Sequence, residues 1–139
     1  MRILIDTNII MDFIVKRGDF SDEAEKLIEL CLKKNVHCCI AAHTIPNLFY
    51  ILRKYLTVED RRDILLKICK IFTVIGIDSH KLISALQDFN FVDFEDSLQI
   101  ECAKDFLSDF IVTRNVKDFE GSVVPAVEPV ELIEKLSKV

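Results

Sequence analysis

Five short apolar runs recur along the chain, and most are rich in β-branched or aromatic residues. They lie at positions 3–5, 38–41, 72–75, 110–112 and 123–127. Between these runs the apolar residues recur three or four positions apart, which is the spacing of a helix with one buried face. Because a parallel neighbour can be reached only by a long crossover, connections of helical length indicate parallel strands. The pattern therefore predicts an α/β fold.

Capping residues place the ends of the predicted helices. The first helix, residues 9–16, is expected to stop at Arg17 and Gly18, since glycine tolerates the positive φ of a helix C-cap. A second helix is expected to run from a Ser21 cap to about Lys33. The residues expected to begin the remaining helices are His43 or Thr44, Thr57, Asp78, Asp93, and Glu128 with Pro129.

Composition narrows the class of protein. With 139 residues, half of them hydrophobic, and a mean hydropathy of +0.27, residues 1–139 are expected to form a single domain. The cysteines are odd in number and show no C-x-x-C spacing, which favours a reducing cytoplasm over a disulfide framework. Arg2 and Asp6 interrupt the N-terminal apolar run, so we expect neither a signal peptide nor a membrane-spanning segment.

The formal net charge of −5 argues against a large nucleic-acid footprint, because non-specific phosphate binding depends mainly on Lys and Arg. The charge is uneven. Residues 51–70 contain six Lys and Arg against three Asp and Glu, a local balance of +3, and the rest of the chain carries −8. Two interpretations stay open for this basic segment: a solvated helix face with internal ion pairs, or a surface that faces RNA or a protein partner.

Acidic residues follow several of the predicted strands. Asp6 ends the first strand, Asp93 and Asp96 open the helix before the fourth, and Asp118 follows the fourth. Because the carboxyl ends of parallel strands share one edge of a sheet, these side chains can converge there. Each residue of Asp6-Thr7-Asn8 also fits the simpler role of a helix N-cap.

A cluster of these carboxylates would require a cation. Two carboxylates about 4 Å apart repel by roughly 4 kcal/mol at an effective dielectric of 20. Asp93 suits the helix cap, which leaves Asp96 free to face the cluster, whereas Glu95 points about 100° away from Asp96 on the helix. Oxygen ligands without a histidine or cysteine partner select Mg²⁺ or Mn²⁺, ions that support phosphodiester cleavage.

Three sequence segments carry a family resemblance: residues 6–12 (DTNIIMD), 93–99 (DFEDSLQ) and 113–119 (TRNVKDF). In this order and over this length, the chain resembles the PIN-domain family and, within it, the VapC-like toxin ribonucleases. The resemblance implies a three-layer α/β/α fold whose central, mainly parallel sheet has four to five strands. It also implies a Mg²⁺- or Mn²⁺-dependent ribonuclease, frequent homodimers, and an antitoxin partner.

The resemblance also assigns the family's site to positions in this chain. The first family aspartate falls on Asp6, the third-motif aspartate on Asp96, and the last acidic or amide position on Asn115, with Asp118 nearby. One position departs from the family: Asn47 stands where many members carry a glutamate. An amide brings no charge and cannot act as a general base, so we expect weaker metal binding.

The leading hypothesis is a metal-dependent endoribonuclease that cleaves RNA and acts as the toxin of a type II toxin–antitoxin pair. Its expected catalytic residues are Asp6, Asp96 and Asp118, and its expected metal ligands are these three with Asn115. The expected assisting residues are Asn8, Asn47, Thr113 and Asp93, and the expected RNA contacts are Arg114, Arg53 and Lys54. The alternatives are a catalytically weak PIN-fold binding module, motivated by Asn47, and a phosphatase-type domain, disfavoured because Asn8 stands where its second aspartate belongs.

Overall fold

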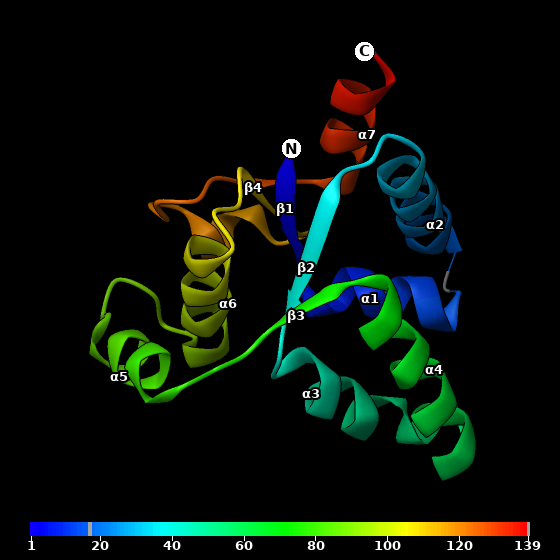
Figure 1. The fold of residues 1–139 in the computed structure, drawn as a ribbon, viewed down its shortest axis with the longest axis horizontal. Coiled ribbons are helices and arrows are strands. Elements are labelled where there is room, and N and C mark those ends of the chain that lie inside the picture. The colour runs from blue at the N-terminus through cyan, green and yellow to red at the C-terminus, as the bar shows by residue number, and fades with distance from the viewer. Residues whose placement is uncertain (17, 139) are drawn as a thin grey trace.

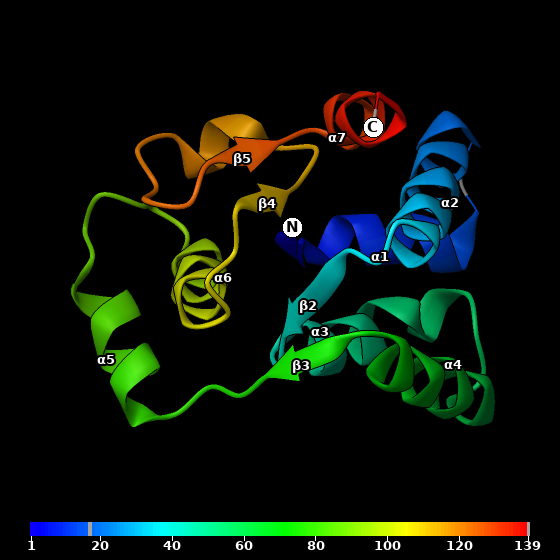
Figure 2. The ribbon, with the colours of Figure 1, turned by 45° about the horizontal axis from the view of Figure 1, so that its top comes forward.

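The computed structural model describes residues 1–16 and 18–138, which fold into alternating strands and helices (Figures 1 and 2). The elements, in chain order, are β1 (Arg2–Ile5), α1 (Thr7–Val15), α2 (Gly18–Lys33), β2 (His37–Ala41), α3 (Thr44–Ile51), the 3₁₀ helix η1 (Leu52–Lys54), α4 (Val58–Ile71), β3 (Thr73–Ile75), α5 (Ser79–Gln87), α6 (Phe94–Asp105), β4 (Phe110–Val112), the 3₁₀ helix η2 (Val116–Phe119), β5 (Ala126–Val127) and α7 (Pro129–Ser137).

Within the described residues, five strands form one sheet in the order β3-β2-β1-β4-β5. Each neighbouring pair is parallel, and β1 occupies the centre, with Ile3 opposite Cys38 on one side and Phe110 on the other. The α/β fold with a parallel sheet, predicted from the alternation of apolar runs, is thus confirmed. The strand predicted at 123–127 is shorter than expected, since only Ala126–Val127 pairs with β4.

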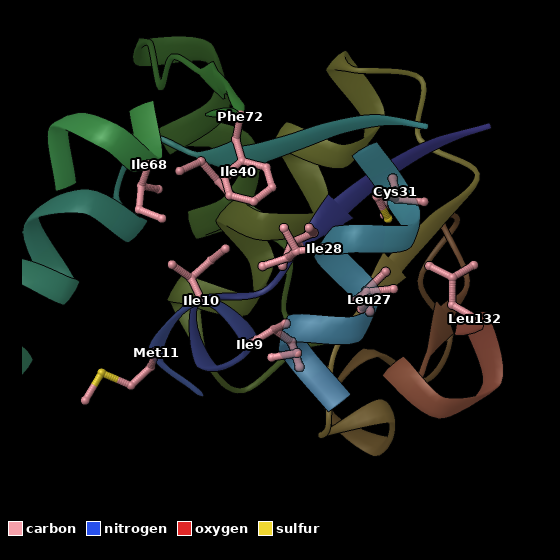
Figure 3. Packing of buried hydrophobic residues seen from close by; sticks show 14 of the residues in the cluster. Ile9, Ile10, Met11, Leu27, Ile28, Cys31, Ile40, Ile68, Phe72 and Leu132 are labelled. Atoms are coloured by element: carbon pink, nitrogen blue, oxygen red, sulfur yellow. The ribbon is translucent and has the colours of Figure 1, made fainter. Parts of the chain in front are cut away.

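Alternate residues of each strand face opposite sides of the sheet, and helices cover both sides. Ile3 and Ile5 of β1 pack against α1, α2, α4 and α7, whereas Leu4 packs against α6. Figure 3 shows the first of these cores, where Ile28 and Leu27 of α2 lie close to the sheet. Helix α5 lies beside α6 and away from the sheet (Figure 1). The three α/β/α layers are therefore present.

Two helix boundaries differ from those predicted. Helix α1 ends with Lys16 in the left-handed region at φ 44°, so lysine takes the C-cap conformation expected of Gly18. Gly18 does have a positive φ, of 55°, but it begins α2, and Ser21 is therefore a buried residue inside that helix and not its cap. Arg17, part of the predicted stop, lies outside the described residues.

The predicted caps at Thr57 and Asp78 form, whereas His43 and Glu128 precede α3 and α7 without a capping hydrogen bond from their side chains. The Thr57 side chain accepts a hydrogen bond from the Asp60 amide at 3.1 Å, and the Asp78 carboxylate accepts one from the Lys81 amide at 3.0 Å. The described helices include none whose length and hydropathy would let it cross a bilayer.

The order of the strands locates a crevice. From β1 the chain builds outward to β2 and β3, then crosses over the sheet through α5 and α6 and adds β4 on the opposite side of β1. Connections from the two flanks of β1 therefore leave in opposite directions at the carboxyl end of the sheet. Ligands of open α/β sheets bind at such a switch point. Asp6 directly follows β1, and Thr113 directly follows β4.

Candidate functional site

Asp6 lies at the centre of this crevice and is 7% exposed. It occupies the N-cap position of α1, but its side chain makes no capping hydrogen bond. Its carboxylate instead accepts hydrogen bonds from Thr113 Oγ1 at 2.8 Å and Gln99 Nε2 at 3.2 Å. The simpler interpretation of Asp6 as a helix cap therefore does not describe its side chain, which is directed to β4 and α6.

The start of α6 brings further carboxylates to the crevice. Asp93 Oδ1 accepts hydrogen bonds from the backbone N–H groups of Glu95 at 2.7 Å and Asp96 at 3.2 Å, so Asp93 caps the helix. The Asp96 side chain, one turn into the helix, is half-buried and accepts none of the capping hydrogen bonds. Glu95 also borders the crevice but is more exposed than Asp96.

The segment after β4 folds back toward Asp6. Thr113 is fully buried, and its hydroxyl both donates to Asp6 and accepts the Asn115 N–H at 3.0 Å. Asp118 follows in η2. The backbone N–H of Asp118 donates to the Asn115 carbonyl at 3.0 Å. The buried Phe119 ring anchors this turn in the core. Asn115 and Asp118 thereby remain exposed at the crevice.

A hydroxyl pair brings α3 to the same place. Thr7 Oγ1 and the buried Thr44 Oγ1 lie 2.9 Å apart, which ties the start of α1 to the start of α3. Asn47 lies one turn further along α3 and faces the crevice. The amide that replaces the family's usual glutamate therefore lies at the edge of the site.

These segments enclose a cavity of about 430 Å³. The predicted site residues that line it are Asp6, Asn8, Asn47, Asp93, Asp96, Asn115 and Asp118. Thr113 lies behind the cavity wall, where it holds Asp6. Sequence positions more than ninety residues apart thus meet at one site.

The predicted RNA contacts lie elsewhere. Arg53 and Lys54 line a neighbouring cavity of about 360 Å³. Arg114 points away from both cavities: its Nε lies 2.8 Å from Oδ2 of the buried Asp12, and its Nη2 donates to Asp12 Oδ1 at 3.2 Å. The Arg114 guanidinium also stacks 4.2 Å from the centre of the Phe20 ring.

Burial and neighbouring carboxylates both raise the pKa values of the site. Burial, followed by repulsion from Asp93, Asp6, Asp118 and Glu95, raises the pKa of Asp96 to about 7. Burial also raises the pKa of Asp6, although the hydrogen bond from Thr113 opposes that rise. An empty cluster of this kind is electrostatically unfavourable at neutral pH, because each ionised carboxylate raises the cost of ionising the next.

The raised pKa of Asp96 predicts how the stability of the metal-free protein changes with pH. The unfolded carboxyl ionises near pH 4 and the folded one near pH 7, so the contribution of Asp96 to stability is lost as pH rises across this window. Asp96→Asn should therefore be more stable than the wild type at pH 7.5, by about 1–2 kcal/mol after allowance for solvent screening of a half-exposed group. Thermal melts in EDTA at pH 4 and 7.5 measure this difference.

At pH 4 the difference in stability should largely disappear, because the folded Asp96 carboxyl is then protonated and the unfolded one is only about half ionised. Asp22→Asn, a change of an exposed aspartate on α2, serves as the matched control and should show no such pH dependence. A variant Asp96→Asn that is less stable than the wild type at pH 7.5 would contradict the repulsion inferred above.

The donor set suits a divalent cation with oxygen ligands. Carboxylate and amide oxygens line the cavity, and no histidine or cysteine is among its lining residues as far as the structure describes them. Gln99 Oε1 is buried beside Asp6 with no protein hydrogen-bond partner in the described part of the chain, as expected for an atom that faces a water or an ion. Mutual repulsion of the carboxylates is a further reason why a cation fits.

Among the residues that the structure describes, the acidic side chains do not form a preformed metal site. Across positions 1–16 and 18–138, no three His, Cys, Asp or Glu side chains are grouped closely enough to hold one metal ion. The Asp6 carboxylate is already engaged by Thr113 and Gln99, while Asp118 is exposed. Carboxylates that repel one another are expected to draw together only when a cation offsets their charge.

Gln99 and Tyr50 are among the side chains of the site that were not predicted from the sequence. Gln99 is 2% exposed and donates to both Asp6 and Thr7, at 3.2 and 3.3 Å. Gln99 lies three residues after Asp96 and therefore on the same face of the helix, so this spacing could have predicted it from the sequence. Tyr50 borders the cavity from α3. It lies three residues after Asn47, so these two residues also share one helix face.

Comparison with known proteins gives one family and a set of similar folds. The PIN domain family model matches residues 2–117. VapBC-1 from nontypeable Haemophilus influenzae aligns with a TM-score of 0.71 at 16% identity, covering 94% of this chain and 99% of that one. VapBC2 from Rickettsia felis, bound to a DNA fragment from its promoter, aligns with a TM-score of 0.68 at 18% identity, covering 92% and 98%.

A toxin–antitoxin complex from Klebsiella pneumoniae aligns with a TM-score of 0.65 at 24% identity, covering 91% of this chain and 96% of that one. No curated protein matches the chain by sequence. At these identities the solved structures support the fold alone.

Proposed function

The chain belongs to the PIN domain family, and from this premise we propose that it is a metal-dependent endoribonuclease, the toxin of a type II toxin–antitoxin pair. The observation that carries the proposal is the convergence of Asp6, Asp96, Asp118 and Asn115 on one cavity at the carboxyl end of a parallel sheet. Burial, with repulsion from the neighbouring carboxylates, raises the pKa of Asp96 and adds support.

In this proposal Asp6, Asp96 and Asp118 are the carboxylate ligands, with Mg²⁺ or Mn²⁺ as the ion. The amides of Asn115, Asn47 and Asn8 assist at the edge of the cavity. When bound, the ion supplies activation of a water and stabilisation of the leaving oxygen in phosphodiester hydrolysis. Thr113 and Gln99 fix both oxygens of Asp6, while Asp93 holds the first turn of α6 so that Asp96 faces inward.

The cavity itself is too acidic to attract RNA, so the nucleic acid requires cations at its border. Arg53 and Lys54 line the adjoining cavity and are our proposed phosphate contacts. Arg114, which we predicted from the sequence to contact RNA, is assigned a structural role instead, because its guanidinium is committed to Asp12 and Phe20.

The protein partners also belong to the proposal. Similar structures are described as VapBC or toxin–antitoxin complexes, which supports an antitoxin partner for this chain. The homodimer implied by the family resemblance stays a prediction, to be checked by sedimentation velocity. The cytoplasmic location, predicted from the cysteines, likewise stays a prediction.

The proposal is tested first by metal binding. Mn²⁺ or Mg²⁺ at ten times its dissociation constant should raise the free energy of unfolding by about 1.4 kcal/mol, because only the folded state assembles the site. That stabilisation corresponds to a rise in Tm of about 4 °C, measured by differential scanning fluorimetry. Asn47→Glu adds a carboxylate at the cavity edge and should increase the rise at equal ion concentration.

Sodium chloride at matched ionic strength is the control, and Asp6→Asn should lose most of the shift. If neither ion changes the Tm at millimolar concentration, the alternative function is favoured: a PIN-fold module that binds RNA or protein without catalysis. The uncharged Asn47 is the observation behind that alternative. Cleavage of labelled RNA, with EDTA as the negative control, decides between the two.

A further inference from the structure

A second cavity adjoins the carboxylate cavity and carries the opposite charge. It measures about 360 Å³, and its wall includes Tyr50, Arg53, Lys54 and Tyr55 but no acidic residue in the described part of the chain. Asn8, Tyr50 and Ile51 line both cavities, so the two lie side by side. A chain-like ligand can therefore occupy both at once.

The turn that ends α3 presents these side chains. Leu52, the first residue of η1, is fully buried and anchors the turn in the main core. The Tyr55 N–H donates to the Leu52 carbonyl at 2.9 Å, which closes the turn. With Leu52 fixed inward, the next three side chains project outward, and Tyr55 is 50% exposed. The cavity is thus built on a rigid element.

Arg53 is held in a defined orientation. Its guanidinium carbon lies 3.7 Å from the centre of the Tyr50 ring, and its Nη1 donates to the Tyr50 carbonyl at 2.8 Å. A guanidinium has five N–H donors, and stacking on the Tyr50 ring fixes the plane of this one at the wall of the cavity. Such a preorganised fork matches the geometry of a phosphate.

Exposed tyrosine rings beside cations are the combination by which proteins hold unpaired nucleotides. Bases stack on aromatic faces, and Arg and Lys bind the backbone phosphates. We propose that this cavity, which we call the Tyr55 subsite, holds the nucleotide next to the cleaved phosphodiester: its base stacks on Tyr55, and its phosphate contacts Arg53 and Lys54. The inference rests on the proposed function, and it adds that the RNA must be unpaired at this nucleotide.

Charge decides in favour of RNA over a protein partner as the occupant. The carboxylate cavity repels a polyanion, so the binding energy for RNA must come from an adjacent basic surface. The Tyr55 subsite is a basic surface that adjoins that cavity. An acidic protein segment could also bind these cations. Unlike RNA, however, it has no phosphodiester to place at the metal ligands of the adjoining cavity.

The test measures binding in the Asp6→Asn background, where RNA is not consumed. The probes are a labelled ten-nucleotide oligoadenylate and inorganic polyphosphate of similar length. Tyr55→Ala should weaken oligoadenylate binding at least about fivefold, which is the lower end of the effect expected when one base loses its stacking partner. Polyphosphate binding should stay unchanged. Tyr55→Phe should bind as tightly as the parent. Lys54→Gln should weaken the binding of both probes. It should also reduce the slope of the logarithm of the binding constant against the logarithm of salt concentration by about 0.7.

Phe89→Ala is the matched control, since this ring is 92% exposed and lines neither cavity. Unchanged oligoadenylate affinity in Tyr55→Ala, or an equal loss for both probes, would overturn the Tyr55 subsite. A change in sedimentation of Tyr55→Ala without a change in RNA affinity would also overturn it, in favour of a protein contact.

Failure of this inference is distinguishable from failure of the proposed function. Wild-type protein that cleaves RNA with Mn²⁺ while Tyr55→Ala leaves KM unchanged refutes the Tyr55 subsite and retains the nuclease. Protein that never cleaves RNA but binds oligoadenylate through Tyr55 refutes the nuclease and retains the subsite.

Discussion

Replacing Asp6 by asparagine is expected to reduce metal-dependent RNA cleavage at least about 100-fold. Asp6 is the buried member of the carboxylate cluster, and both of its oxygens are fixed by hydrogen bonds from β4 and α6. Since loss of a residue that merely orients a metal ligand costs about 10–100-fold, loss of a ligand itself should cost more. Initial rates of cleavage of labelled RNA at saturating Mn²⁺ measure the effect.

The fold should survive this change. Asparagine has the shape of aspartate, and its amide nitrogen would face a donor from Thr113 or Gln99, which costs about 1 kcal/mol. Removal of a charge whose burial is unfavourable offsets part of that cost. The Tm should therefore stay within a few degrees of the wild type. Asp22→Asn is the matched control and should retain full activity, whereas cleavage retained by Asp6→Asn would remove the nuclease hypothesis.

Replacing Arg114 by glutamine is expected to lower the free energy of unfolding by about 3 kcal/mol, or the Tm by about 10 °C. The Asp12 carboxyl, 1% exposed, interacts with the Arg114 guanidinium through two nitrogens. Glutamine removes the positive charge while Asp12 stays buried, and breaking such a pair from one side is costly because the remaining charge loses its compensation. Urea unfolding and thermal melts measure the loss.

Two further variants separate this role from RNA binding. Arg114→Lys should recover only part of the stability, because an ammonium cannot reproduce the two-pronged contact. The double variant with Asp12→Leu and Arg114→Met should recover most of it, since a buried ion pair replaced by apolar groups is often neutral. If Arg114 contacts phosphate instead, Arg114→Gln will reduce the salt dependence of RNA binding and leave the Tm unchanged.

Both predictions concern the same part of the molecule, the segment after β4 and the cavity beside it. Ion pairing of Arg114 with Asp12 joins the segment after β4 to α1, and the neighbouring residue Asn115 is thereby placed at the cavity. The cavity carboxylates, in contrast, are expected to reduce stability until an ion binds. Stability thus comes from the Arg114 side of this segment, and the chemistry from its Asn115 side.

Much of the architecture followed from residues close together in the chain. Alternating apolar runs and helical spacing predicted the parallel sheet, because both patterns are set by the periods of strand and helix. The caps at Asp78 and Asp93 were equally accessible, since a cap bonds to an amide two or three residues away. The acidic residues at strand ends predicted the common cavity through the rule that parallel strands share one edge.

Only the tertiary structure decided which side chains bond to one another across the fold. Asp6 meets Gln99 and Thr113, and Arg114 turns to Asp12, between positions separated by 93 to 107 residues. Such partners depend on rotamers and on the packing of several helices, which no local period encodes. The raised pKa of Asp96 arises in the same way, because burial and neighbouring charges exist only once distant segments have come together.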